Sequence, residues 1–369
     1  MNRRAATTQG LLALAGLIAA YFTWQREPSL DNGQAYILDI TKGELQSIRY
    51  EELEPVAKPE ADDKNAKPKD APAPAEPKVR DWVELTSTKE DAGRAVWMRL
   101  AGKEGSNVAL PSGHPMVQTA VPERLVRGNE SAEKMWDLFS PFSASRALGK
   151  LDAEKVKDLG LDQPKKRLKV TFKGVTKTFT LAPAPPGGTD PYVRDDEDGM
   201  VYIVARQILS DFQAARTNMT QRKLHGFIMA DVDKVVITAS GKKKEFQFRR
   251  FDGRPGGELL PASAPDKPDQ TAGNWHERVF ALFPAEVLGK GEKPAAGEPK
   301  VVVRIEYLYR NKLVGWLDLG RSGGEAGTAG AAPSPVQTFA RSEFTAGWMT
   351  LSPDAQNLVS EGETTFGAP

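Results

Sequence analysis

Apolar and polar residues alternate with a period of two over several segments of the chain. In residues 168–172 every second residue is apolar, Lys173-Gly174 can form a turn, and the alternation resumes over residues 178–181. A period of two places successive side chains on opposite faces of a strand, so this segment predicts a β-hairpin with one solvated face. Residues 303–319 predict a second hairpin, with its turn at Asn311-Lys312.

Fewer segments have the three-and-four spacing of amphipathic helices. Apolar residues recur with this spacing in residues 135–142, behind a possible cap at Ser131, and in residues 204–212. Asp152 can cap a short helix, and Ser352-Pro353-Asp354 places a cap, a proline and an acid where a last helix would begin. We expect these short helices to cover one face of the sheets.

The first 28 residues have the pattern of a membrane anchor. Two arginines lie among the first four residues, and residues 5–25 carry no charged side chain. A helix from Thr7 to Trp24 would be about 27 Å long, close to the roughly 30 Å of a bilayer's hydrocarbon core. The arginines predict a cytoplasmic N-terminus. We therefore expect residues 1–28 to be a retained single-pass anchor in a bacterial inner membrane, with the body in the periplasm; a cleaved signal peptide is the alternative.

The body is predicted to contain an internal repeat. Residues 191–212 align without a gap to residues 338–359, and this alignment places Arg194 opposite Arg341. The repeat predicts two tandem modules, residues 33–218 and 219–369. The first module would carry a disordered insert at residues 54–78, where six prolines stand among alternating charges.

The predicted fold class is α+β. We expect a single N-terminal transmembrane helix, followed by two tandem repeated modules of antiparallel hairpins with short amphipathic helices on one face.

Composition excludes several classes of function. The chain of 369 residues has 50 lysines and arginines against 49 acidic residues, and a net charge of +1 disfavours nucleic acid as a partner. The absence of cysteine excludes disulfides, thiolate metal sites and cysteine nucleophiles. We predict no catalytic residue, no metal and no cofactor.

The segment LGLDQP at residues 159–164 precedes a predicted strand at residues 167–172, then two further strands and an amphipathic helix. With the single N-terminal membrane helix and a strand region at residues 38–45, this arrangement resembles the bacterial family named domain of unknown function 4340. The resemblance implies a membrane-anchored periplasmic protein of repeated α+β units, often encoded beside an ABC-type transporter similar to gliding-motility systems. It implies no catalytic residues. The second module departs from it, because a clear Gly-Leu-Asp-x-Pro segment is missing there.

Three groups of side chains are candidates for chemistry. The acidic run 195–198 could hold calcium, although a solvated hairpin turn is favoured. Arg194 and Arg341 could bind a carboxylate or phosphate, although exposed strand arginines are common. The three histidines, which are far apart in sequence and have no nucleophile elbow near them, give little support to a catalytic triad; they are His114, His225 and His276.

The leading hypothesis is a non-enzymatic accessory or scaffold protein of an ABC-type transport or gliding-motility-like envelope complex. Its expected partners are the inner membrane and a membrane or periplasmic protein, such as an ABC transporter subunit. One alternative is an envelope protein that binds or hydrolyses glycan through paired carboxylates. Another is a calcium-dependent adhesion module.

Overall fold

The computed structural model describes residues 35–54, 77–90, 93–104, 119–184, 187–251, 256–295, 297–323 and 335–367. The predicted anchor at residues 1–28 lies outside these ranges, as do His114 and nearly all of the predicted insert at residues 54–78. Within the described ranges, no helix combines the length and the hydropathy that a bilayer crossing requires.

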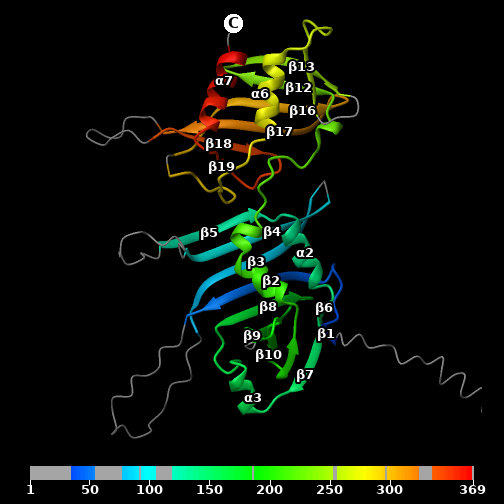
Figure 1. Cartoon of the computed structure of the whole chain (residues 1–369), viewed down its shortest axis with the longest axis vertical. Helices are drawn as coiled ribbons and strands as arrows, with labels where there is room; N and C mark the ends of the chain where they lie inside the picture. The colour runs from blue at the N-terminus through cyan, green and yellow to red at the C-terminus, as the bar shows by residue number, and fades with distance from the viewer. Residues whose placement is uncertain are drawn as a thin grey trace, which may run out of the picture.

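The chain forms two lobes, each built on one antiparallel sheet (Figure 1). The strands of the first sheet, from edge to edge, are β5 (Thr119–Arg127), β4 (Gly93–Glu104), β3 (Val79–Glu90), β2 (Leu45–Leu53), β8 (Lys166–Phe172), β9 (Val175–Ala182), β10 (Tyr192–Asp195), β11 (Met200–Ile203) and β7 (Arg146–Lys150). A separate ribbon pairs β1 (Ala35–Leu38) with β6 (Phe142–Ala144).

The second sheet repeats this order of strands. Its strands are β14 (Gly257–Pro261), β13 (Lys242–Arg250), β12 (Lys234–Ala239), β16 (Lys300–Tyr309), β17 (Lys312–Ser322), β18 (Gln337–Ser342), β19 (Met349–Thr350) and β15 (Glu286–Val287). Strands β2 and β12 occupy corresponding places, as do β8 and β16, and β5 is an additional strand of the first sheet. The predicted module boundary between residues 218 and 219 stays a prediction.

The helices are short. They are α2 (Glu130–Leu138), α3 (Ala153–Asp158), α4 (Arg206–Gln213), α5 (Ala215–Asn218), the 3₁₀ turn η1 (Met229–Asp231), α6 (Gln270–Phe280) and α7 (Ala355–Gly367). Asp152 caps α3 as expected, because its carboxylate accepts the Lys155 N–H at 2.9 Å. The cap of α2 is Asn129 rather than Ser131, since the Asn129 side chain accepts the N–H groups of Ser131 and Ala132.

The predicted α+β class is wrong. Strands contain 46% of the described residues and helices 20%, arranged as three antiparallel sheets. The expected helical stripe at residues 135–142 is cut short, because α2 ends at Leu138 and Phe142 already begins β6. Cross-strand pairing also extends β3 and β4 to 12 residues each, through polar positions that carry no clear pattern.

Both predicted hairpins form. Strands β8 and β9 are joined at Lys173-Gly174, as expected. Strands β16 and β17 are joined at Arg310-Asn311, one residue before the predicted turn, and both turn residues have positive φ, 50° and 63°. Two successive residues with positive φ match the right-handed twist of the paired strands.

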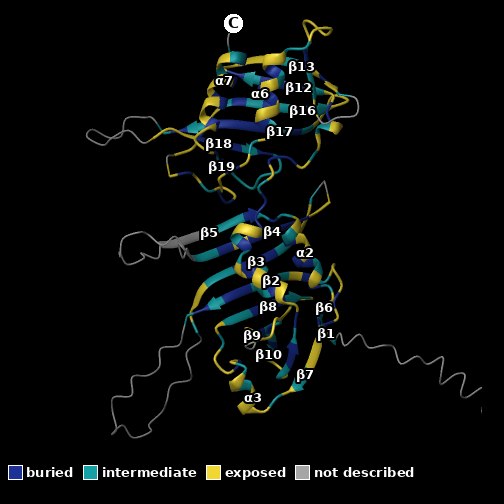
Figure 2. Cartoon of the chain, viewed as in Figure 1, coloured by how far each residue is buried: buried dark blue, intermediate teal, exposed yellow. Residues whose placement is uncertain are grey.

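One face of each sheet is covered. In the second lobe α6 and α7 cross the sheet (Figure 1) and are joined by the Trp275 indole N–H, which donates to the Leu358 carbonyl at 2.8 Å. In the first lobe Phe212 of α4 stacks on Tyr50 of β2. Buried residues follow the strands of both sheets (Figure 2). The opposite face of the second sheet presents the polar residues that alternate with the core.

Candidate interaction face of the second lobe

Alternation along β16 separates two sets of side chains. Val303, Ile305 and Tyr307 are fully buried in the core beneath α6 and α7, so Arg304 and Glu306 lie on the opposite, open face. Pairing with β17 and β18 then aligns Arg304, Asp318 and Arg341 directly across three strands. We call this set the Arg-Asp-Arg row.

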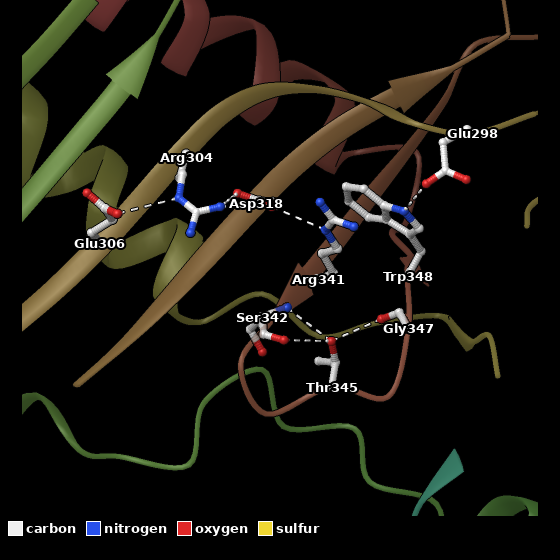
Figure 3. A network of polar contacts seen from close by, with 9 residues as sticks. All are labelled: Glu298, Arg304, Glu306, Asp318, Arg341, Ser342, Thr345, Gly347 and Trp348. Carbon is white, nitrogen blue, oxygen red and sulfur yellow. Dashed lines mark hydrogen bonds and ion pairs between the residues drawn. The ribbon is translucent and has the colours of Figure 1, made fainter. Parts of the chain in front are cut away.

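Asp318 is the centre of the row and is only 1% exposed. Its carboxylate accepts from Nη1 of Arg304 at 3.1 Å and from Nε of Arg341 at 3.2 Å (Figure 3). Burying a carboxylate is unfavourable unless hydrogen-bonded cations compensate for the lost water, and the two guanidinium groups do so here. Asp318 in turn fixes the orientation of both arginines.

Tryptophan rings hold the outer parts of these arginines. The Arg304 guanidinium lies 4.8 Å from the centre of the Trp316 ring, and that of Arg341 lies 4.4 Å from the Trp348 ring. The Trp348 indole N–H donates to Glu298 at 3.3 Å (Figure 3). Stacking of this kind stabilises a guanidinium without removing it from solvent, and both arginine side chains remain 39% exposed.

The turn that follows β18 supports the end of the row. The Ser342 N–H donates to the Thr345 hydroxyl oxygen at 3.0 Å, and that hydroxyl also lies 3.0 Å from the Gly347 carbonyl (Figure 3). Glu343 in this turn accepts the backbone N–H of Trp316 at 2.6 Å. The backbone on both sides of Arg341 is therefore tied to its neighbours.

The first lobe has a related arrangement on its own sheet. Glu51 of β2 is 1% exposed and accepts from Nε of Arg49 at 2.7 Å and from Nζ of Lys169 at 3.1 Å. The Arg49 guanidinium lies 3.9 Å from the centre of the Trp82 ring. Both sheets thus contain a buried carboxylate, a basic partner from a neighbouring strand, and an arginine stacked on tryptophan.

The predicted arginine pair lies at corresponding places, on β10 and β18. Arg194 is held by Asp196 at 3.2 Å, whereas Arg341 is held by the buried Asp318. Sequence reasoning singled out the arginines but missed Asp318 and Glu51. The available signal was one acid within an otherwise apolar run, in Leu317-Asp318-Leu319.

The acidic run forms the turn between β10 and β11. Asp195 pairs with Lys177 at 2.9 Å, which raises the pKa of that lysine, and Asp196 accepts the Thr180 hydroxyl at 2.8 Å. Asp198 accepts the Met200 N–H at 2.8 Å. These contacts are those of a closed hairpin turn. In the described ranges no group of three His, Cys, Asp or Glu side chains is close enough to hold a metal ion.

Two of the three histidines meet in the second lobe, around Tyr307. The centres of the His225 and His276 rings lie 5.1 and 5.6 Å from that of Tyr307, and His225 stacks on Phe280 at 4.8 Å. Burial, and then the charge of His225, lower the pKa of His276 to about 4. No local pattern brings these histidines together, because they belong to different elements.

Comparison with known proteins connects this architecture to a family. Residues 141–278 match the family model described as a domain of unknown function, DUF4340. This segment belongs to the DUF4340 family. The matched DUF4340 segment begins just before β6 and ends in α6, so it includes parts of both lobes. No curated protein and no solved structure matches the chain.

Proposed function

We propose that this DUF4340 protein is a non-enzymatic scaffold, anchored in a bacterial inner membrane through residues 1–28, with its body in the periplasm. The open face of the second sheet would bind a subunit of an ABC-type transport or gliding-motility-like complex. The observation that carries the proposal is the Arg-Asp-Arg row, with its two half-exposed, tryptophan-stacked arginines.

Arginine and tryptophan dominate the binding energy of many protein interfaces. Arg304 and Arg341 are already oriented by Asp318, so binding would restrict them little further. Each guanidinium keeps solvent-exposed area through which it can donate to a carboxylate. We therefore expect the partner to place acidic side chains, flanked by apolar ones, over the row.

Glycan hydrolysis is less well supported. That chemistry needs two facing carboxyl groups roughly 5 to 10 Å apart, one of which donates a proton. Three carboxylates are buried among the described residues, Asp318 on the second sheet and Glu51 and Asp195 on the first. Strands β8 and β9 separate Glu51 on β2 from Asp195 on β10, and each of the three carboxylates accepts a hydrogen bond from lysine or arginine.

The test is purification of the full-length protein from native membranes in mild detergent, followed by mass spectrometry. The test variant combines Arg304→Met, Asp318→Leu and Arg341→Met, which replaces the row by apolar side chains of similar size and leaves no buried charge unpaired. Glu306 loses its contact with Arg304, but its side chain is partly exposed. The control is Arg250→Met at an exposed arginine of β13.

We expect the wild type and the control to recover an ABC permease and ATPase in stoichiometric amounts, and the triple variant to lose them. Equal recovery by the triple variant would contradict the assigned face. Recovery of no transporter subunit by the wild type, even after crosslinking, would contradict the scaffold function.

A further inference from the structure

A cavity of about 230 Å³ lies at the junction of the two lobes. The first lobe supplies Arg124 of β5 and Arg216 of α5, and β15 of the second lobe supplies Glu286. Arg222 belongs to the connecting segment, residues 219–228, which lies between α5 and η1. Three arginines therefore line one small, mostly polar cavity, together with Thr217 and Thr220.

The junction around this cavity is tied by specific contacts. Arg124 donates through Nη1 to Glu286 at 3.0 Å and pairs through Nη2 with Glu292 at 2.9 Å. The Lys290 N–H donates to the Leu125 carbonyl at 2.7 Å. These bonds all join β5 of the first lobe to residues of the second, so the cavity has walls from both lobes.

The three arginines that line the cavity differ in how many carboxylates they pair with. Arg124 has Glu286 and Glu292, and Arg216 has Asp81 at 3.1 Å. Arg222 makes no hydrogen bond or ion pair with any residue that the structure describes. Among the three arginines that line the cavity, Arg222 is thus the one without an anionic partner in the described residues.

Two buried donors remain unsatisfied as well. The Nε atoms of Arg124 and Arg222 are inaccessible to solvent and have no hydrogen-bond partner among the described residues. A buried N–H without an acceptor is costly, and one on a charged group is more so. Both atoms belong to side chains that line the same cavity.

We propose that this cavity binds a small oxyanion, with the chemistry of a phosphate or a carboxylate. Its oxygens would accept from the outer N–H groups of Arg222, and its negative charge would balance the charge of this arginine between the connecting segment and β5. Guanidinium groups suit this role because their planar donors match the spacing of oxygens on such anions. Ligand binding at this place would stabilise the arrangement of the two lobes.

The test is thermal unfolding of the full-length protein in detergent, titrated with inorganic phosphate and, separately, with acetate. Sodium chloride at matched ionic strength removes general salt effects. The test variant is Arg222→Gln. The control is Arg250→Gln, which removes the same charge from an exposed side chain that makes no hydrogen bond or ion pair with the described residues.

We expect phosphate or acetate to raise the melting temperature of the wild type and the control saturably, by about 2 °C or more at tenfold excess over the dissociation constant. Arg222→Gln should abolish the rise. A rise with phosphate alone identifies a phosphate-type ligand, and a rise with acetate alone a carboxylate. The proposal is overturned if neither anion exceeds chloride, or if Arg222→Gln responds as the wild type does.

Discussion

Arg304 of the second sheet occupies the position that Arg167 occupies in the first. Arg167 is paired with Glu51 of β2 on one side and with Thr180 of β9 on the other. Arg304 is paired with Thr238 of β12 and Asp318 of β17. Each arginine thus has one threonine and one buried carboxylate beside it, but the carboxylate lies on opposite neighbouring strands in the two lobes.

Removing the carboxylate of Asp318 should destabilise the second lobe. We expect Asp318→Ala to lower the free energy of unfolding by about 2 kcal/mol, because two guanidinium groups lose their shared acceptor. The triple apolar variant of the row should recover most of this loss. Urea unfolding of both variants measures the difference, and a triple variant no more stable than Asp318→Ala would show that the row contributes by other means.

The packing of α7 against α6 depends on a glycine. A Cβ atom at Gly362 would lie 2.4 Å from Cζ2 of the buried Trp275, so Gly362→Ala should cost about 2 kcal/mol of stability. Gly273 on α6 has no atom within 4 Å of such a Cβ, and Gly273→Ala should instead add about 0.5–1 kcal/mol. Thermal unfolding of the two variants should give shifts of opposite sign.

Buried His276 should make stability depend on pH. Its pKa is about 4 in the folded protein and 6.5 in the unfolded chain, so the unfolded chain binds the extra proton between these values. The free energy of unfolding should therefore decrease as the pH is lowered below about 6.5. His276 alone should account for a decrease of about 2 kcal/mol between pH 7 and pH 5.

The variant His276→Leu isolates this contribution. The decrease in unfolding free energy between pH 7 and pH 5 should be smaller in the variant by the same amount, because all other titrating groups remain. Equal decreases in the two proteins would show that His276 takes up its proton without unfolding.

The alternation of apolar and polar residues was sufficient to predict both hairpins. The alternation over residues 166–182 and 300–322 reflects one buried and one open face, which is a property of each strand by itself. The sequence predicted the second turn one residue too late, at Asn311-Lys312. The turn lies at Arg310-Asn311, and no glycine in the sequence marks its positive φ angles. The fold class was wrong because long strands such as β3 continue at both ends through polar residues that have no distinctive periodicity.

The candidate site could not be predicted from the sequence, because it is formed by the pairing of separate strands. Asp318 is buried by Arg304 and Arg341, which belong to neighbouring strands and are brought to it only by the register of the sheet. Likewise, the cavity at the lobe junction combines Arg124, Arg222 and Glu286 from three distant segments. No spacing within one segment predicts either arrangement.

We propose that the open face of the second sheet contacts a transporter subunit. Site-specific photocrosslinking in cells tests it most directly, with the photoreactive residue placed at Glu306 on the open face or at Glu361 on α7, which covers the other face. We predict a crosslink to an ABC transporter subunit from position 306 and none from position 361. Crosslinks from position 361 alone, or from neither position, would contradict the claim.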